Sequence, residues 1–225
     1  MFARQDNFDS RALRYTDCYG QRFMRAGVYH YNVIPTGGRN LTADRPFVIH
    51  VAERKGEERM KQHNVILDWA NNEFKPDHRE LAIEVGDLVL WNCTSTSAPP
   101  YEVASDKDFF GSYNLVNECG FSHAFGFPGI YEWADINGSG VCGVVRVKNP
   151  ACKTQAEIAR WQTNLSTGTI VMVANDKANP AEVEIEVGQT VFFAIVAGRG
   201  ITITDRRLHT LGDCLPQDRK SAEAR

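Results

Sequence analysis

Four side chains of the kinds that bind soft metal ions stand in the middle of the chain, namely Cys93, Cys119, His123 and Cys142. Cys119 and His123 form a C-x-x-x-H pair, and thiolate and imidazole groups suit both copper and zinc. The chain has no C-x-x-C pair and no closely spaced histidines, which are the usual spacing of a zinc site. The alternative is that the cysteines are small core residues, because reduced cysteine is among the most buried residue types, and that His123 is a solvated or hydrogen-bonded strand residue.

Two polar loops also combine residues that could bind ions. Pro35-Thr-Gly-Gly-Arg-Asn40 joins turn residues to an arginine, so it is either an anion-binding loop or an ordinary turn. Asp135–Gly140 resembles the front half of a calcium loop, but it lacks the acidic ligand at the twelfth position and is therefore predicted to be a turn. The motifs of hydrolases, metalloproteases, P-loop proteins and dinucleotide-binding folds are absent from the sequence. We predict no catalytic residue, and a protein that is not an enzyme.

Composition narrows the possible partners. The chain has 225 residues, of which 43% are hydrophobic and 24% charged, so it can build a folded core. Its net charge of −3 favours neither nucleic acid nor an anionic membrane as a partner, because both attract basic surfaces. No apolar run approaches the length of a membrane helix. If Met1 is the native start, the charged residues that follow it predict a cytoplasmic protein with mostly reduced cysteines.

One phrase occurs twice in the chain, at an offset of 102 residues. Residues 81–91 read LAIEVGDLVLW, and residues 183–193 read VEIEVGQTVFF. In both copies apolar residues alternate with others on each side of a Gly-Asp or Gly-Gln turn, which is the period-2 pattern of a β-hairpin. Further strands are predicted at Val28–Val33, Phe47–Ala52, Asn64–Ala70, Gly129–Ala134, Gly143–Lys148, Thr169–Ala174 and Gly200–Asp205. Short strands at this spacing predict an all-β sandwich or barrel.

The residues around the first copy resemble a known family. Phe74-x-Pro76 is followed by E-V-G-D-x-V-x-W from Glu84, by Phe110-Gly-Ser, and by Pro128-Gly-x-Tyr131-x-Trp133. In this order residues 63–148 resemble a cupredoxin, the plastocyanin-type Greek-key sandwich. The second copy of the phrase has its closing motifs at the N-terminus, beginning with Phe8-Asp9-Ser10. The resemblance therefore implies two cupredoxin-like Greek-key β-sandwiches, one of them circularly permuted.

This interpretation divides the chain into three parts. Residues 60–150 form an intact domain, residues 1–54 with 165–225 form a permuted one, and residues 152–164 form a connecting helix. In the permuted domain, Phe8–Ala52 supplies the closing strands of a sandwich whose opening strands lie in Thr167–Asp205. A second, weaker helix is predicted at Arg54–Gln62.

The resemblance also implies one-electron transfer by blue copper, held by two histidines, a cysteine and usually a methionine. In the intact copy those positions carry Tyr101, Asp135, Gly138 and Val141, and the permuted copy also lacks the ligands. We therefore predict no cofactor and no metal site, and a non-catalytic structural or interaction protein that is a subunit of a homo-oligomer or larger assembly of proteins. The alternative is a copper-binding electron carrier or copper chaperone that uses the relocated residues Cys93, Cys119, His123 or Cys142.

Overall fold

The computed structural model describes residues 6–38, 43–56, 59–116 and 118–209. Over these residues the chain forms strands β1–β16, one α-helix and two short 3-10 turns, so the predicted all-β fold class is confirmed. The described part of Arg54–Gln62 contains no helix, which contradicts the second helix prediction.

The strands fall into two sequence halves. In the first half they are β1 (Asp17–Arg22), β2 (Gly27–Pro35), β3 (Phe47–Ala52), β4 (Gln62–Ala70), β5 (Glu73–Pro76), β6 (Glu80–Glu84), β7 (Leu88–Cys93) and β8 (Tyr101–Ser105). In the second half they are β9 (Cys119–Ala124), β10 (Gly129–Ala134), β11 (Cys142–Lys148), β12 (Thr169–Ala174), β13 (Lys177–Asn179), β14 (Glu182–Glu186), β15 (Thr190–Ala197) and β16 (Thr204–Asp205). The 3-10 turns are Asp106–Asp108 and Arg206–Leu208, and the helix α1 spans Gln155–Asn164.

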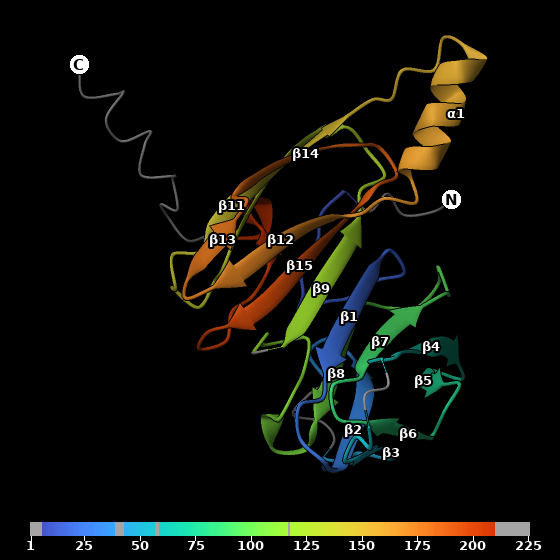
Figure 1. The fold of residues 1–225 in the computed structure, drawn as a ribbon, viewed down its shortest axis with the longest axis vertical. Coiled ribbons are helices and arrows are strands. Elements are labelled where there is room, and N and C mark those ends of the chain that lie inside the picture. Colours follow the sequence, from blue (N-terminus) through green and yellow to red (C-terminus); the bar gives the residue numbers. More distant parts are fainter. Residues whose placement is uncertain (1–5, 39–42, 57–58, 117, 210–225) are drawn as a thin grey trace.

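Three sheets form two layers. An eight-stranded sheet has the order β13-β12-β15-β9-β1-β7-β4-β5, and two four-stranded sheets have the orders β14-β11-β10-β16 and β6-β3-β2-β8. Figure 1 shows β15, β9 and β1 side by side in the middle of the molecule. The small sheets cover one face of the large sheet: Tyr31 of β2 lies 5.6 Å from Trp91 of β7 and Trp133 of β10 lies 5.2 Å from Phe193 of β15, measured between ring centroids.

The same set of strand pairs occurs in both halves. The parallel pairs β3–β6 and β4–β7 of the first half match the parallel pairs β11–β14 and β12–β15 of the second. The antiparallel pairs β2–β8 and β10–β16 also correspond. The halves meet where β1 pairs with β9, with Gly20 opposite Gly120, and this ladder makes the large sheet continuous.

These pairs do not follow the predicted division of the chain. β3 pairs with β6 and β2 with β8, so strands within residues 1–54 belong with residues 62–105 and not with Thr167–Asp205. In the same way β9 pairs with β15 and β11 with β14, so residues 60–150 are not one closed unit. The reason is that hydrophobic alternation identifies a strand and its buried face but not its ladder partner, and each opening segment had two sets of closing strands available in the sequence, at Val28–Ala52 and at Gly129–Lys148.

The N-terminal segment nevertheless reaches the second half, through Phe8–Ser10. Ser10 donates its amide hydrogen to the Ile203 carbonyl (2.9 Å), and its hydroxyl accepts from the Ile203 amide (3.2 Å). The Phe8 ring is buried against Phe121 and Phe193. The N-terminal residues therefore complete the core of the second half with a short segment and not with strands.

The segment between the halves makes the matching contact with the first half. Ser112 donates its amide hydrogen to the Val103 carbonyl (3.0 Å), and its hydroxyl accepts from the Val103 amide (3.1 Å). Phe110 is buried, with its ring centroid 5.6 Å from that of Trp91 and 5.3 Å from that of Phe23. Each Phe-x-Ser segment thus closes the half that does not follow it in sequence.

Helix α1 begins three residues later than predicted and does not lie between the sandwiches. Thr154 and Glu157 form a capping box, which sets the first turn. The Trp161 indole donates to the Val187 carbonyl (2.8 Å), and Leu165 lies over Gly188, so the helix packs on the β14–β15 turn. Ile158 and Trp161 are only half-buried there. Figure 1 shows α1 at one end of the molecule.

The reciprocal closure predicts a pair of local effects. Phe8→Ala should cost about 3–5 kcal/mol of unfolding free energy, because it leaves a cavity among buried rings. Hydrogen exchange should then rise in β15 and β16, whereas Phe110→Ala should raise it in β7 and β8. Tyr15→Ala is the control, since Tyr15 is 48% exposed and should change stability little. Faster exchange confined to β1–β3 in Phe8→Ala would contradict the closure.

Candidate functional site

The four candidate metal ligands do not converge. Cys93 lies at the end of β7 in the first half, whereas Cys142 begins β11 in a small sheet of the second half. Cys119 and His123 lie at opposite ends of β9. Among the described residues, no group of three or more His, Cys, Asp or Glu side chains is placed to hold a metal ion.

Burial keeps three of the cysteines in the thiol form. It raises the pKa of Cys18 to about 12, and it also raises the pKa of Cys93 and of Cys119 above the ordinary value. A thiol that does not ionise is a poor metal ligand and a poor nucleophile. This supports the packing interpretation of these residues.

Cys18 and Cys119 lie on opposite faces of the large sheet. Cys119 is buried beside Gln21, whereas Cys18 is only half-buried and pairs with Ser122. The reason is the period of two residues in a strand, since Cys18 neighbours the inward-facing Tyr19.

His123 is held in the core. Its Nδ1 atom lies 2.6 Å from an Asp17 carboxylate oxygen, and the other oxygen accepts from the Arg14 amide (2.8 Å). The imidazole ring lies between Phe8 and Phe125, with ring centroids 5.2 and 4.6 Å away, and is 1% exposed. The pair therefore joins β9 to the start of β1, and among the alternatives given by the sequence the hydrogen-bonded strand residue fits.

In the second half, the loop in which the resemblance places copper ligands is held by hydrogen bonds of the protein itself. Asp135 is buried, and its carboxylate accepts hydrogen bonds from the amides of Asn137 (3.1 Å), Ser139 (3.0 Å) and Thr202 (2.8 Å) and from the Thr202 hydroxyl (3.1 Å). Burial alone would raise the pKa of Asp135, but these amide donors lower it below its ordinary value. Both carboxylate oxygens are in use, so the turn interpretation of 135–140 is supported over a calcium loop.

The other three positions have structural surroundings too. Gly138 has a φ of 82° in the same turn, which suits a residue without a Cβ, and Val141 is buried. Tyr101 is fully buried; its backbone bridges to Leu13 and its ring centroid lies 5.0 Å from that of Phe74. These three residues are therefore engaged in turn and core contacts of the fold.

The first half has an open groove near its β2–β3 connection. It has a volume of about 600 Å³, and its lining includes Val33, Phe74, Lys75 and Arg79. The predicted anion-binding loop Pro35–Asn40 reaches this region, but its last two residues lie outside the described part of the chain. The described residues therefore do not decide between the anion-binding loop and the turn.

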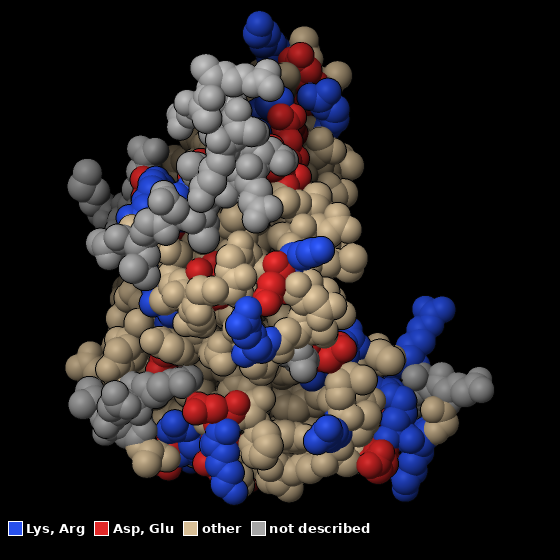
Figure 2. Space-filling view, turned by 90° about the vertical axis from the view of Figure 1, so that its left-hand side faces the viewer, with Lys and Arg blue, Asp and Glu red and all other residues tan. Residues whose placement is uncertain are grey.

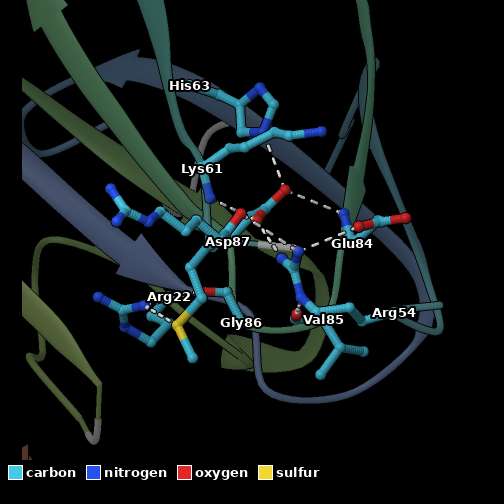
Figure 3. Close-up of polar contacts among 10 residues, drawn as sticks. Arg22, Arg54, Lys61, His63, Glu84, Val85, Gly86 and Asp87 are labelled. Carbon is cyan, nitrogen blue, oxygen red and sulfur yellow. Dashed lines mark hydrogen bonds and ion pairs between the residues drawn. The ribbon is translucent and has the colours of Figure 1, made fainter. Parts of the chain in front are cut away.

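The densest polar cluster surrounds a residue that the sequence interpretation treated only as part of a turn. The Asp87 carboxylate accepts from the amides of Lys61 (2.8 Å) and Glu84 (3.2 Å), lies 3.0 Å from His63 Nε2, and forms an ion pair with Arg54 (Figure 3). Burial raises its pKa, but the two amides, the imidazole and the guanidinium outweigh burial and hold the pKa of Asp87 well below its usual range. Both oxygens are occupied, so the cluster fixes the β6–β7 turn and has no acceptor left for a substrate.

Two neighbouring contacts tie this turn to other strands. Arg54 donates to the Val85 carbonyl (2.8 Å), and Arg22 of β1 donates to the Gly86 carbonyl (2.7 Å). In the second half Gln189 takes the place of Asp87 and accepts from the Glu186 amide (2.7 Å). The Gly-Asp and Gly-Gln steps of the repeated phrase indicated the residues that fix these two turns, whereas no pattern pointed to Arg54 or His63.

No protein-family model matches this chain, and no similar protein was found among the curated proteins or the solved structures.

None of the helices in the described residues has both the length and the apolar composition needed to span a membrane. On the side of the molecule drawn in Figure 2, basic and acidic side chains are interspersed over a largely uncharged surface.

The Asp87 cluster predicts a pH-dependent loss of stability. Asp87→Asn should cost about 2–4 kcal/mol, because it removes one member of a buried charged network. A carboxyl with a lowered folded-state pKa stabilises the protein above its unfolded pKa of about 3.9, and that contribution disappears as the pH falls toward the folded value. The stability difference between wild type and Asp87→Asn should thus shrink below about pH 4.

Urea denaturation at a series of pH values measures this difference. Glu73→Gln is the control, since Glu73 is an exposed carboxylate on β5 and should leave the unfolding free energy nearly unchanged. A difference that stays constant down to about pH 2 would show that Asp87 does not carry the effect.

Proposed function

We propose that this protein is a non-catalytic structural or interaction module built from two cupredoxin-like Greek-key sandwiches that have lost copper, and that it works as a subunit of an assembly. The observation that carries the proposal is that Tyr101, Asp135, Gly138 and Val141, the four former ligand positions of the family pattern, are engaged in core packing or in hydrogen bonds of the protein itself.

The strand order supports the cupredoxin-like part of the proposal. Each half pairs a four-strand portion of the large sheet with a four-stranded sheet, in matching orders: β5-β4-β7-β1 with β6-β3-β2-β8, and β13-β12-β15-β9 with β14-β11-β10-β16. The family pattern begins at β4 and ends with the Pro-Gly-x-Tyr strand and the strand after it. In both halves those closing strands come first in the sequence, so we propose that both sandwiches, and not one, are circular permutations of the family pattern.

Corresponding residues support a duplication. Tyr29 donates its hydroxyl to the Arg25 carbonyl, and Tyr131 donates its hydroxyl to the Phe127 carbonyl, both at 2.9 Å and both to the fourth residue upstream. Each tyrosine follows a Gly-Val or Gly-Ile step at the start of β2 or β10. The same local contact in two places is the result that a repeated sequence unit should give.

The second part of the proposal is assembly with protein partners. The location in the cytoplasm stays a prediction from the sequence. The buried and hydrogen-bonded polar residues of both sandwiches serve the fold, so recognition must use the surface. On the side drawn in Figure 2, acidic and basic side chains are mixed, and this side therefore offers no single-sign field for nucleic acid.

A copper titration followed by visible spectroscopy and metal analysis tests the loss of copper. We expect the protein mixed with Cu(II) to lack the intense blue absorption of a thiolate-bound copper site, because the described cysteines with raised pKa values do not converge with histidines.

The alternative electron carrier or copper chaperone makes the opposite prediction. An intense thiolate-to-copper band that disappears in Cys142→Ser, and persists in the control Cys152→Ser at an exposed cysteine outside the sandwiches, would overturn the proposal and support the alternative.

A further inference from the structure

The outer face of the large sheet is apolar and uncovered in the second half. Ile170 and Met172 of β12 are 58% and 49% exposed, and Val196 of β15 is 45% exposed. Phe192 and Ala194 are half-buried on the same side of β15. These five residues are called the β12–β15 face. Figure 1 shows β12, β15 and β9 side by side, with α1 beyond the strand ends and not across them.

Three of the five matching positions of the first half are polar. The ladders align Val65 with Trp91 and Val171 with Phe193, so Asn64 corresponds to Ile170 and Asn92 to Ala194. By the same alignment Ile66 corresponds to Met172, Leu90 to Phe192 and Thr94 to Val196. A sandwich with this strand order therefore folds with polar residues at three of these five outer positions. The apolar residues of the second half are not needed for folding, and contiguous exposed apolar surface marks an interaction site.

Glycine makes the centre of this surface flat. A Cβ atom on Gly120 of β9 would lie 2.3 Å from the Phe192 ring, so that ring lies directly across the β9 backbone. Leu90 lies across Gly20 of β1 in the same way, where a Cβ would be 2.7 Å from its side chain. Because Gly20 and Gly120 pair in the sheet, the two side chains cover adjacent backbone and leave a low surface on which another sheet can lie.

We propose that a second copy of this chain packs on the β12–β15 face, sheet against sheet, in a symmetric contact. The proposal deepens the assembly part of the proposed function and rests on it. All five residues of the face are uncharged, so two identical faces meet without repulsion between like charges. A charged partner would find no complementary group on it. A symmetric contact also buries the same apolar patch on both copies at once.

The size of the face sets the strength of the contact. The contact area is estimated from the three neighbouring strands β12, β15 and β9. The strands are spaced about 4.8 Å apart, and each is about six residues long with a rise of about 3.3 Å per residue, so together they cover roughly 300 Å² of sheet. Stable complexes usually bury about 800 Å² on each partner, so this contact is smaller than a stable interface and should be weak and transient. We therefore expect a reversible dimer that is populated only at high protein concentration.

Sedimentation equilibrium of the full chain, from low micromolar to several hundred micromolar, measures this association. The test variant Ile170→Asn, Ala194→Asn, Val196→Thr copies the first-half residues onto the second half, so the strands can tolerate it. We expect its dimer dissociation constant to rise by roughly tenfold or more, with an unchanged circular dichroism spectrum. The control is Ile130→Lys, because Ile130 is 63% exposed on β10, in one of the small sheets.

A wild-type chain that stays monomeric at all concentrations would overturn the proposal. So would a dimer that the triple variant leaves as strong as before, or one that Ile130→Lys weakens as much as the triple variant does. None of these results would affect the copper experiment, so a failure of this contact is distinguishable from a failure of the proposed function.

Discussion

The reciprocal exchange of two short segments is the constraint on which the two-layer arrangement depends. In the N-terminal segment Asp9 bridges to Thr204 of the second half, and four residues later Leu13 bridges to Tyr101 of the first. In the middle segment Gly111 bridges to Ala104 of the first half, and four residues later Leu115 bridges to Ile201 of the second. Each segment therefore contributes backbone hydrogen bonds to both halves, and neither core is complete without it.

Because of this exchange, the two halves form one cooperative structure and not two independent domains joined by a linker. The β1–β9 ladder runs through the middle of the large sheet, and the buried Asp17–His123 contact spans it. Independent domains usually meet through smaller and more polar surfaces that allow relative motion. Here, separation of the halves would expose a sheet edge, the Phe8 ring and a buried carboxylate–imidazole pair together. A single opening at the junction would incur all of these costs at once, so partial opening there is strongly disfavoured.

The sequence was sufficient for local structure because local structure depends on neighbouring residues. The repeated phrase correctly predicts strands β6, β7, β14 and β15 and the turns between them, but its hairpin interpretation is wrong, because β6 and β14 lie in the small sheets and β7 and β15 in the large one. It was insufficient for the ladder partners, because partners such as β3 and β6 are separated by a long stretch of chain and several strands have the same alternating pattern. The exchange was missed for the same reason: Phe8-Asp9-Ser10 and Phe110-Gly-Ser were recognised as equivalent motifs, but a motif does not specify the core that it enters.

The candidate site shows the same contrast between local sequence patterns and long-range contacts. The spacing of Cys93, Cys119, His123 and Cys142 matched no regular metal motif, and among the described residues no group of three or more His, Cys, Asp or Glu side chains is placed to hold a metal ion. The Asp87 cluster could not be found in this way. Its side-chain partners Arg54 and His63 come from the β3–β4 connection and from β4, and only the folded chain brings them to the β6–β7 turn.

Two halves with the same strand pairs also provide an internal comparison that a single domain lacks. Where both halves keep a residue type, as with Tyr29 and Tyr131 or Gly86 and Gly188, the shared backbone explains it. Where they differ, the backbone does not. Asp87 with its ion pairs is replaced by Gln189, which bonds the Asn164 and Thr167 carbonyls after α1, so each turn is adapted to the connection that covers it. The outer face of β4 and β7 carries Asn64, Asn92 and Thr94 where that of β12 and β15 carries Ile170, Ala194 and Val196, and no such covering segment among the described residues accounts for the difference. Contacts within the fold do not explain these three replacements, which agrees with the proposed contact of a second copy on this face.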